Sequence, residues 1–81
     1  MVKVALWGSL RSAADGRTAV EIEARNFREL LQRLQEAYPG LAPQIARGVS
    51  MSLNGVIYRE AWFTAIPPDA EVVLMPYMTG G

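Results

Sequence analysis

The residues best suited to chemistry lie at the carboxyl end of the chain, which reads Met78-Thr79-Gly80-Gly81. Glycine has no side chain, so two successive glycines let the backbone approach a ligand closely and adopt any φ. The reactive group of such a segment is the carboxylate of Gly81. The five residues from Tyr77 onward can extend roughly 17 Å. We therefore interpret Gly80 and Gly81 as a terminal tail that the rest of the chain presents.

Side chains that commonly carry out catalysis are scarce in this chain. It has no cysteine and no histidine, which excludes thiolate nucleophiles, disulfides, histidine general bases and a serine–histidine–aspartate triad. Lys3 is the only lysine, and no glycine-rich loop surrounds it. Asp69 and Glu71 could be mistaken for catalytic acids, but an expected turn and strand start explain them better. The chain is therefore expected to supply a reactive terminus and to bind no metal or cofactor.

Composition indicates one small folded domain. Of the 81 residues, 51% are hydrophobic and 20% are charged, which argues against disorder, and the formal net charge is zero. No basic stripe suits a phosphate backbone, and no apolar run approaches the roughly 20 residues of a membrane span. The N-terminal sequence lacks the features of a signal peptide. We therefore expect a cytoplasmic protein that binds neither nucleic acid nor membrane.

Hydrophobic patterns predict the elements that position the tail. Strands are expected at residues 2–7, 18–24, 49–53, 56–59 and 71–75, and a main helix at residues 27–38. Residues 8–16 are expected to form a loop, and residues 41–48 a short turn of helix. Asn26 is predicted to cap the main helix, with Glu29 reaching back to the Asn26 N–H. Asn54-Gly55 predicts a tight hairpin turn.

This order of two strands, a helix and three further strands indicates an α+β fold. The pattern matches a ubiquitin-like β-grasp, a mixed sheet with one main helix packed on one face. A ferredoxin-like fold is the competing topology, but only residues 41–48 could supply the second helix that it needs. The first and last strands are expected to be central neighbours. Residues 1–76 form the expected domain, and residues 77–81 form a flexible Gly-Gly tail.

The two faces of the expected sheet differ in role. The main helix is expected to cover Val4, Leu6, Val72 and Leu74. The opposite face would carry apolar side chains of the last and first strands, namely Val73, Met75, Tyr77, Ala5 and Trp7. An apolar outer face beside the tail predicts an interaction patch, with Arg11 in the neighbouring loop as a further contact. Trp62 and Phe63 are expected mainly to pack.

These segments and their order resemble the MoaD/ThiS family of small sulfur-carrier proteins, most closely its molybdopterin synthase small-subunit branch. The resemblance covers essentially the whole chain through Val2-Lys3-Val4, Gly8-Ser9-Leu10-Arg11, Phe27-Arg28-Glu29-Leu30-Leu31, Tyr38-Pro39, Leu53-Asn54-Gly55, Asp69-Ala70-Glu71-Val72 and the segment from Pro76 to Gly81. Each segment is weak alone. The chain departs from the family's usual Gly-Asp-Glu-Val turn before the last strand, and it has Tyr77 and Met78 where a small residue or proline is common.

The resemblance implies that a ubiquitin-activating-type enzyme uses ATP to adenylate the Gly81 carboxylate. A sulfur donor would then displace AMP and leave a C-terminal thiocarboxylate. The sulfur would pass to an acceptor, expected to be the large subunit of molybdopterin synthase in molybdenum cofactor biosynthesis. Gly81, with Gly80 beside it, would be the reacting terminus. The expected partner-binding residues are Thr79, Met78, Tyr77, Met75, Val73, Trp7 and Arg11.

Other functions are compatible with the same residues. The chain could carry sulfur for thiamine synthesis or tRNA thiolation, or it could be a ubiquitin-like modifier joined through Gly81 to target lysines. It could also be a β-grasp binding module whose tail has no role, because a fold alone does not specify a function. Isopeptide-linked conjugates would indicate a modifier. Activity that survives deletion of the tail would indicate a binding module.

Overall fold

The structure is a computed structural model that describes residues 1–59 and 62–76. Its strands are β1 (Val2–Leu6), β2 (Ala19–Ile22), β3 (Val49–Leu53), β4 (Val56–Tyr58) and β5 (Glu71–Pro76). Its helices are α1 (Ser9–Ala13), α2 (Phe27–Ala37), the 3-10 helix η1 (Pro39–Leu41) and α3 (Ala42–Arg47). The predicted order of strands and main helix is confirmed, and α1 and η1 are additional.

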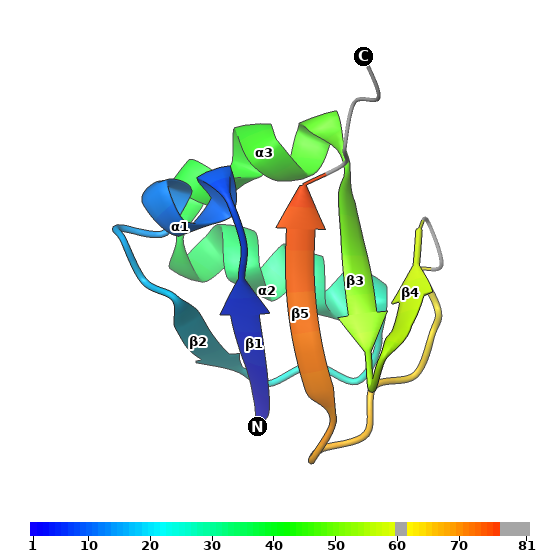
Figure 1. Cartoon of the computed structure of the whole chain (residues 1–81). Coiled ribbons are helices and arrows are strands. Elements are labelled where there is room, and N and C mark those ends of the chain that lie inside the picture. The colour runs from blue at the N-terminus through cyan, green and yellow to red at the C-terminus, as the bar shows by residue number, and fades with distance from the viewer. Residues whose placement is uncertain (60–61, 77–81) are drawn as a thin grey trace.

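The strands form one mixed sheet in the order β2-β1-β5-β3-β4 (Figure 1). β1 and β5 are parallel neighbours, and the other strand pairs are antiparallel. The first and last strands are therefore adjacent, as their sequences predict. Because they run in the same direction, the C-terminal ends of both strands lie at the same end of the sheet.

Helix α2 lies across one face of the sheet and covers the core (Figure 1). The alternation in β1 and β5 sends Val4, Leu6, Val72 and Leu74 to this side, where all four are buried. The apolar positions of α2 meet them: Phe27, Leu30, Leu31 and Leu34 are buried as well. Each fully buried side chain of this size contributes roughly 1.5–3 kcal/mol. The predicted division into a covered and an uncovered sheet face is confirmed.

The N-terminus of α2 departs slightly from the predicted cap. The Oδ1 atom of Asn26 accepts a hydrogen bond from the Glu29 N–H at 2.8 Å, as expected. The Glu29 carboxylate, however, accepts from the N–H of Arg25 at 3.2 Å rather than from that of Asn26. Asn26 is extended there and forms an antiparallel bridge with Ala65, so the carboxylate meets the N–H one residue earlier.

The prediction of a loop at residues 8–16 is wrong, because this segment contains α1. The single turn forms through tertiary packing: Leu10 and Ala14 are buried in the core. Gly8 permits the turn that precedes α1, since its φ of 61° is one that residues with a side chain rarely adopt. The Leu10 N–H then donates to the Trp7 carbonyl at 3.3 Å.

Residues 39–47 also hold more helix than predicted. The 3-10 helix η1 begins at Pro39, directly after Tyr38 ends α2 by donating its N–H to the Leu34 carbonyl. Gly40 lies against α1, and a Cβ atom added there would be 2.5 Å from the Ala13 carbonyl oxygen. This close approach lets η1 and α1 pack together and requires glycine at position 40.

The β3–β4 hairpin forms as predicted at Asn54 and Gly55, whose φ values are 49° and 88°. These left-handed conformations match a tight two-residue turn. The turn pairs Leu53 with Val56 and thereby fixes the register of the whole hairpin. The described helices are all too short or too polar to span a lipid bilayer.

Candidate docking face and reactive terminus

The sheet face that α2 leaves uncovered carries one charged row of side chains. Lys3 in β1 is paired with Glu21 of β2 on one side and with Glu71 of β5 on the other. Opposite charges at cross-strand positions favour each other. This row lies near the first residues of β1 and β5, away from the end of the sheet where the two strands finish.

Two uncharged rows follow toward the end of β1 and β5. The middle row runs across the sheet through paired positions Ala19, Ala5, Val73, Ser52 and Ile57. In the last row, Met75 is paired with Ser50. The Trp7 N–H donates to the Leu74 carbonyl at 3.1 Å, which continues the strand alignment and places Trp7 beside Met75.

We call the surface formed by Ala5, Trp7, Ser52, Ile57, Val73 and Met75 the docking face. The Trp7 side chain is 52% exposed and that of Ile57 is 62% exposed, whereas Val73 and Met75 are half-buried. Trp7, Val73 and Met75 thus lie together, as their strand positions predict. None of these six side chains is charged, and the docking face extends to the end of the sheet at which β5 finishes.

The sequence reasoning did not include Ile57 in this face. The signal was present, because the Asn54-Gly55 turn pairs Leu53 with Val56 and therefore Ser52 with Ile57. Ser52 neighbours Val73 in turn, so the register extends the row from β5 to the edge strand β4.

The described chain ends next to the turn that follows β1. Pro76 is the last described residue, and its ring would lie 3.5 Å from a Cβ atom added at Gly8. A Cβ at position 8 would make an ordinary van der Waals contact with this ring, so only the left-handed backbone penalises a side chain there. The segment that follows Pro76 begins at the same edge as Trp7 and Met75.

Arg11 has a structural contact in addition to its predicted role. Its Nε–H donates to the Leu6 carbonyl at 2.8 Å, which ties α1 to the end of β1. The side chain is otherwise exposed. Contact between Arg11 and a partner protein stays a prediction.

The remaining predicted site residues, Tyr77, Met78, Thr79, Gly80 and Gly81, lie outside the described residues. The reactivity of Gly81 and the flexibility of the tail therefore stay predictions. Residues 1–59 and 62–76 contain no group of three acidic side chains that could hold a metal ion.

Comparison with known proteins identifies a family. The model of the ThiS family matches residues 4–81, which is nearly the whole chain and includes Gly80 and Gly81. A comparison with curated protein sequences finds no significant match.

Several solved structures share the fold at low sequence identity. The crystal structure of Mycobacterium tuberculosis CysO, an antigen, superposes with a TM-score of 0.81 at 19% identity and covers 96% of this chain and 100% of that one. The Amycolatopsis orientalis BexX/CysO complex gives a TM-score of 0.79 at 16% identity, with both chains fully covered. Small archaeal modifier protein 1 from Methanosarcina acetivorans gives 0.78 at 24% identity, covering 99% of this chain and 95% of that one.

These likenesses confirm the predicted α+β fold, a ubiquitin-like β-grasp with a mixed five-stranded sheet. The match to the family model spans the strands, the main helix and the two terminal glycines. The chain therefore belongs to the ThiS family of ubiquitin-like sulfur carriers.

Proposed function

We propose that this chain is a sulfur carrier whose Gly81 carboxylate is adenylated by a ubiquitin-activating-type enzyme and converted to a thiocarboxylate. The carboxylate attacks the α-phosphate of ATP and releases pyrophosphate. A sulfur nucleophile then attacks the acyl carbon, and AMP leaves. The thiocarboxylate gives its sulfur to an acceptor enzyme, which we propose to be the molybdopterin synthase large subunit.

The observation that carries this proposal is the family match through Gly81. The chemistry is consistent with it. A carboxylate is a poor electrophile, so it requires activation before sulfur can attack. The reacting group belongs to the main chain, and the partner supplies ATP and catalytic side chains. A chain without cysteine or histidine can perform this role.

The geometry of the docking face supports the same function. Trp7 and Met75 lie at the sheet edge where β5 ends, so an enzyme that binds them receives the tail beside its binding surface. Apolar and aromatic side chains are enriched at the centres of protein interfaces. The tail can extend roughly 17 Å from there, enough to enter a channel while the folded body stays outside.

The test is an intact-mass spectrum after incubation with ATP, an adenylating enzyme and a sulfide source. We expect a mass gain equal to the replacement of one oxygen by sulfur. A variant that lacks Gly81 should show no gain. If the full chain gains no such mass with any ubiquitin-activating-type enzyme tried, the carrier function is wrong.

The molybdopterin pathway is tested separately with the thiocarboxylated protein. Addition of a molybdopterin synthase large subunit and its pterin substrate should return the mass to that of the carboxylate form. If only thiamine or tRNA thiolation enzymes consume the sulfur, the carrier chemistry holds and the pathway is wrong. Isopeptide-linked conjugates in extracts would favour the modifier function.

A further inference from the structure

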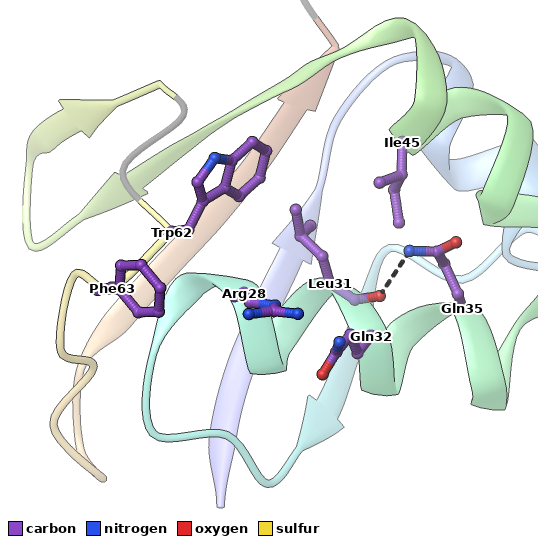
Figure 2. A pocket seen from close by; sticks show the side chains of 7 residues that line it. All are labelled: Arg28, Leu31, Gln32, Gln35, Ile45, Trp62 and Phe63. Atoms are coloured by element: carbon purple, nitrogen blue, oxygen red, sulfur yellow. Dashed lines mark hydrogen bonds between the residues drawn. The ribbon is translucent and has the colours of Figure 1, made fainter.

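A hollow of about 410 Å³ lies on the side of the molecule opposite the docking face. Figure 2 shows its walls, which come from α2, from α3 and from the segment that follows β4. We call it the Trp62 hollow. Its apolar lining consists of Leu31, Ile45, Trp62 and Phe63. Because α2 packs on the covered face of the sheet, the hollow and the docking face are on separate sides.

The backbone that carries the two aromatic residues is held in place by the fold. The Trp62 carbonyl accepts the Arg28 N–H at 2.8 Å, and the Thr64 carbonyl accepts the Phe27 N–H at 3.1 Å. These bonds also satisfy first-turn donors of α2. The Trp62 ring stacks on Phe27 with a centroid distance of 5.6 Å. The segment is therefore anchored to α2 at the hollow.

Despite this anchoring, both aromatic rings face solvent. Trp62 is 43% exposed and Phe63 is 78% exposed. Packing against Phe27 accounts for the burial of one face of the Trp62 ring. Packing in the core gives no reason for the aromatic ring at position 63. Adjacent exposed aromatic side chains around a hollow are typical of an interaction site.

The charge of the hollow is positive. Among the residues that the structure describes, Arg28 is the one ionisable residue of the lining, and Gln32 and Gln35 complete the polar rim. Arg28 is exposed and pairs with no acidic side chain of the described chain, whereas Glu29 on the same helix is engaged by Arg33 at 3.9 Å. Figure 2 shows the Arg28 side chain between Phe63 and Leu31. An occupant with a carboxylate beside an apolar group complements this arrangement.

We propose that the Trp62 hollow binds a short peptide segment of a partner protein that inserts one large apolar side chain and places an acidic side chain beside Arg28. The volume of the hollow is near the lower end of the range for ligand pockets, roughly 300–1,000 Å³. The exposed Phe63 ring offers a contact surface rather than an enclosure, which suits a peptide better than a small molecule. The Gln35 amide nitrogen already donates to the Leu31 carbonyl at 3.2 Å, so the Gln35 amide oxygen and the amide of Gln32 can bond to the peptide main chain.

The test is an NMR titration of the full chain with capped peptides of defined sequence. One set is Asp-Glu-X-Asp-Glu, in which X is Leu, Phe or Trp. A second set replaces each acid with lysine, and a third has Gly at X. We expect saturable shifts of the Arg28, Ile45 and Trp62 amides with the acidic apolar set, and unchanged Ala5 and Val73 amides.

Matched variants separate the hollow from non-specific effects. Arg28→Glu should weaken binding of the acidic apolar peptides at least about tenfold, because it reverses the charge at the rim. Arg33→Glu changes the net charge by the same amount and lies on the same helix, but outside the hollow. It should leave the affinity within about twofold. Phe63→Ala should weaken binding, whereas Ile57→Ala, an exposed apolar residue on the docking face, should not.

Three results would overturn the proposal. The first is the absence of saturable shifts at Arg28, Ile45 and Trp62 with any acidic apolar peptide. The second is equal binding of the acidic and lysine sets. The third is the appearance of the same shifts when the protein alone is concentrated, which would make a second copy of the chain the occupant.

Discussion

Trp7 allows the docking face to be tested by one side chain. Trp7 is 52% exposed, so Trp7→Ser should lower the free energy of unfolding by about 1–2 kcal/mol and leave the domain folded. If Trp7 contacts the adenylating enzyme, its loss should raise the KM for adenylation about 30-fold, the effect of a typical aromatic interface residue. The measurement is the rate of pyrophosphate release against carrier concentration.

Phe63→Ser is the matched control for Trp7→Ser. It also removes an exposed aromatic ring, but on the opposite side of the molecule. Its KM for adenylation should equal that of the wild type. Equal effects of the two substitutions would contradict the assignment of the docking face.

Gly40 provides a residue-scale test of the packing between η1 and α1. In Gly40→Ala, the new Cβ would meet the Ala13 carbonyl oxygen at 2.5 Å, and backbone must shift to relieve the overlap. We expect a loss of about 2–3 kcal/mol in the free energy of unfolding, measured by urea denaturation.

Gly16→Ala separates this steric effect from a conformational one. Gly16 has a φ of 79° and open space around the added Cβ, so only the left-handed backbone is penalised, by about 1–2 kcal/mol. Gly40→Ala should therefore be the more damaging substitution. If Gly40→Ala unfolds at the wild-type urea concentration, the close approach of η1 to α1 is wrong.

Among the elements, α2 depends on a cap that the sequence predicts well. The Asn26 side chain accepts the Glu29 N–H at 2.8 Å. Asn26→Ala should lower the free energy of unfolding by about 1 kcal/mol, because it leaves a first-turn donor without its partner. Asn26→Asp keeps the acceptor oxygen and should retain wild-type stability. A similar loss in both variants would show that the amide serves another purpose.

The elements with a clear pattern were predictable, and those that depend on packing were not. The strands β1, β3 and β5 alternate, and α2 has a regular apolar face and a cap, so their positions follow from sequence. The position of helix α1 does not follow from the sequence, because a single turn is too short to show a hydrophobic period or to be stable alone. It forms because Leu10 and Ala14 find space in the core.

The candidate functional surfaces also comprise one part that the sequence predicts and one part that it does not. The positions of Trp7, Val73 and Met75 follow from alternation once β1 and β5 are neighbours. The Trp62 hollow could not be predicted, because it requires α2, α3 and the segment after β4 to meet. Adjacent aromatic residues indicate burial in a sequence, and only the packing shows that Trp62 and Phe63 remain exposed.

At the scale of the whole molecule, the sheet separates two surfaces with different chemistry. The docking face is uncharged and lies at the sheet edge where the tail begins. The Trp62 hollow is on the helix side and carries the charge of Arg28, which no acidic side chain of residues 1–59 and 62–76 pairs with. A partner on one surface therefore leaves the other open to solvent.

This separation predicts that the two partners bind independently. The affinity of a labelled Asp-Glu-Phe-Asp-Glu peptide, measured by fluorescence anisotropy, should change less than about twofold when the adenylating enzyme is saturating. Arg28→Glu should lose the peptide and still be adenylated with the wild-type KM, whereas Trp7→Ser should show the reverse pattern. If the enzyme displaces the peptide, or if either substitution impairs both activities, the two surfaces belong to one interface. If Arg28→Glu impairs only peptide binding and Trp7→Ser impairs only adenylation, the carrier can be bound through its helix side while its tail reacts on the sheet side.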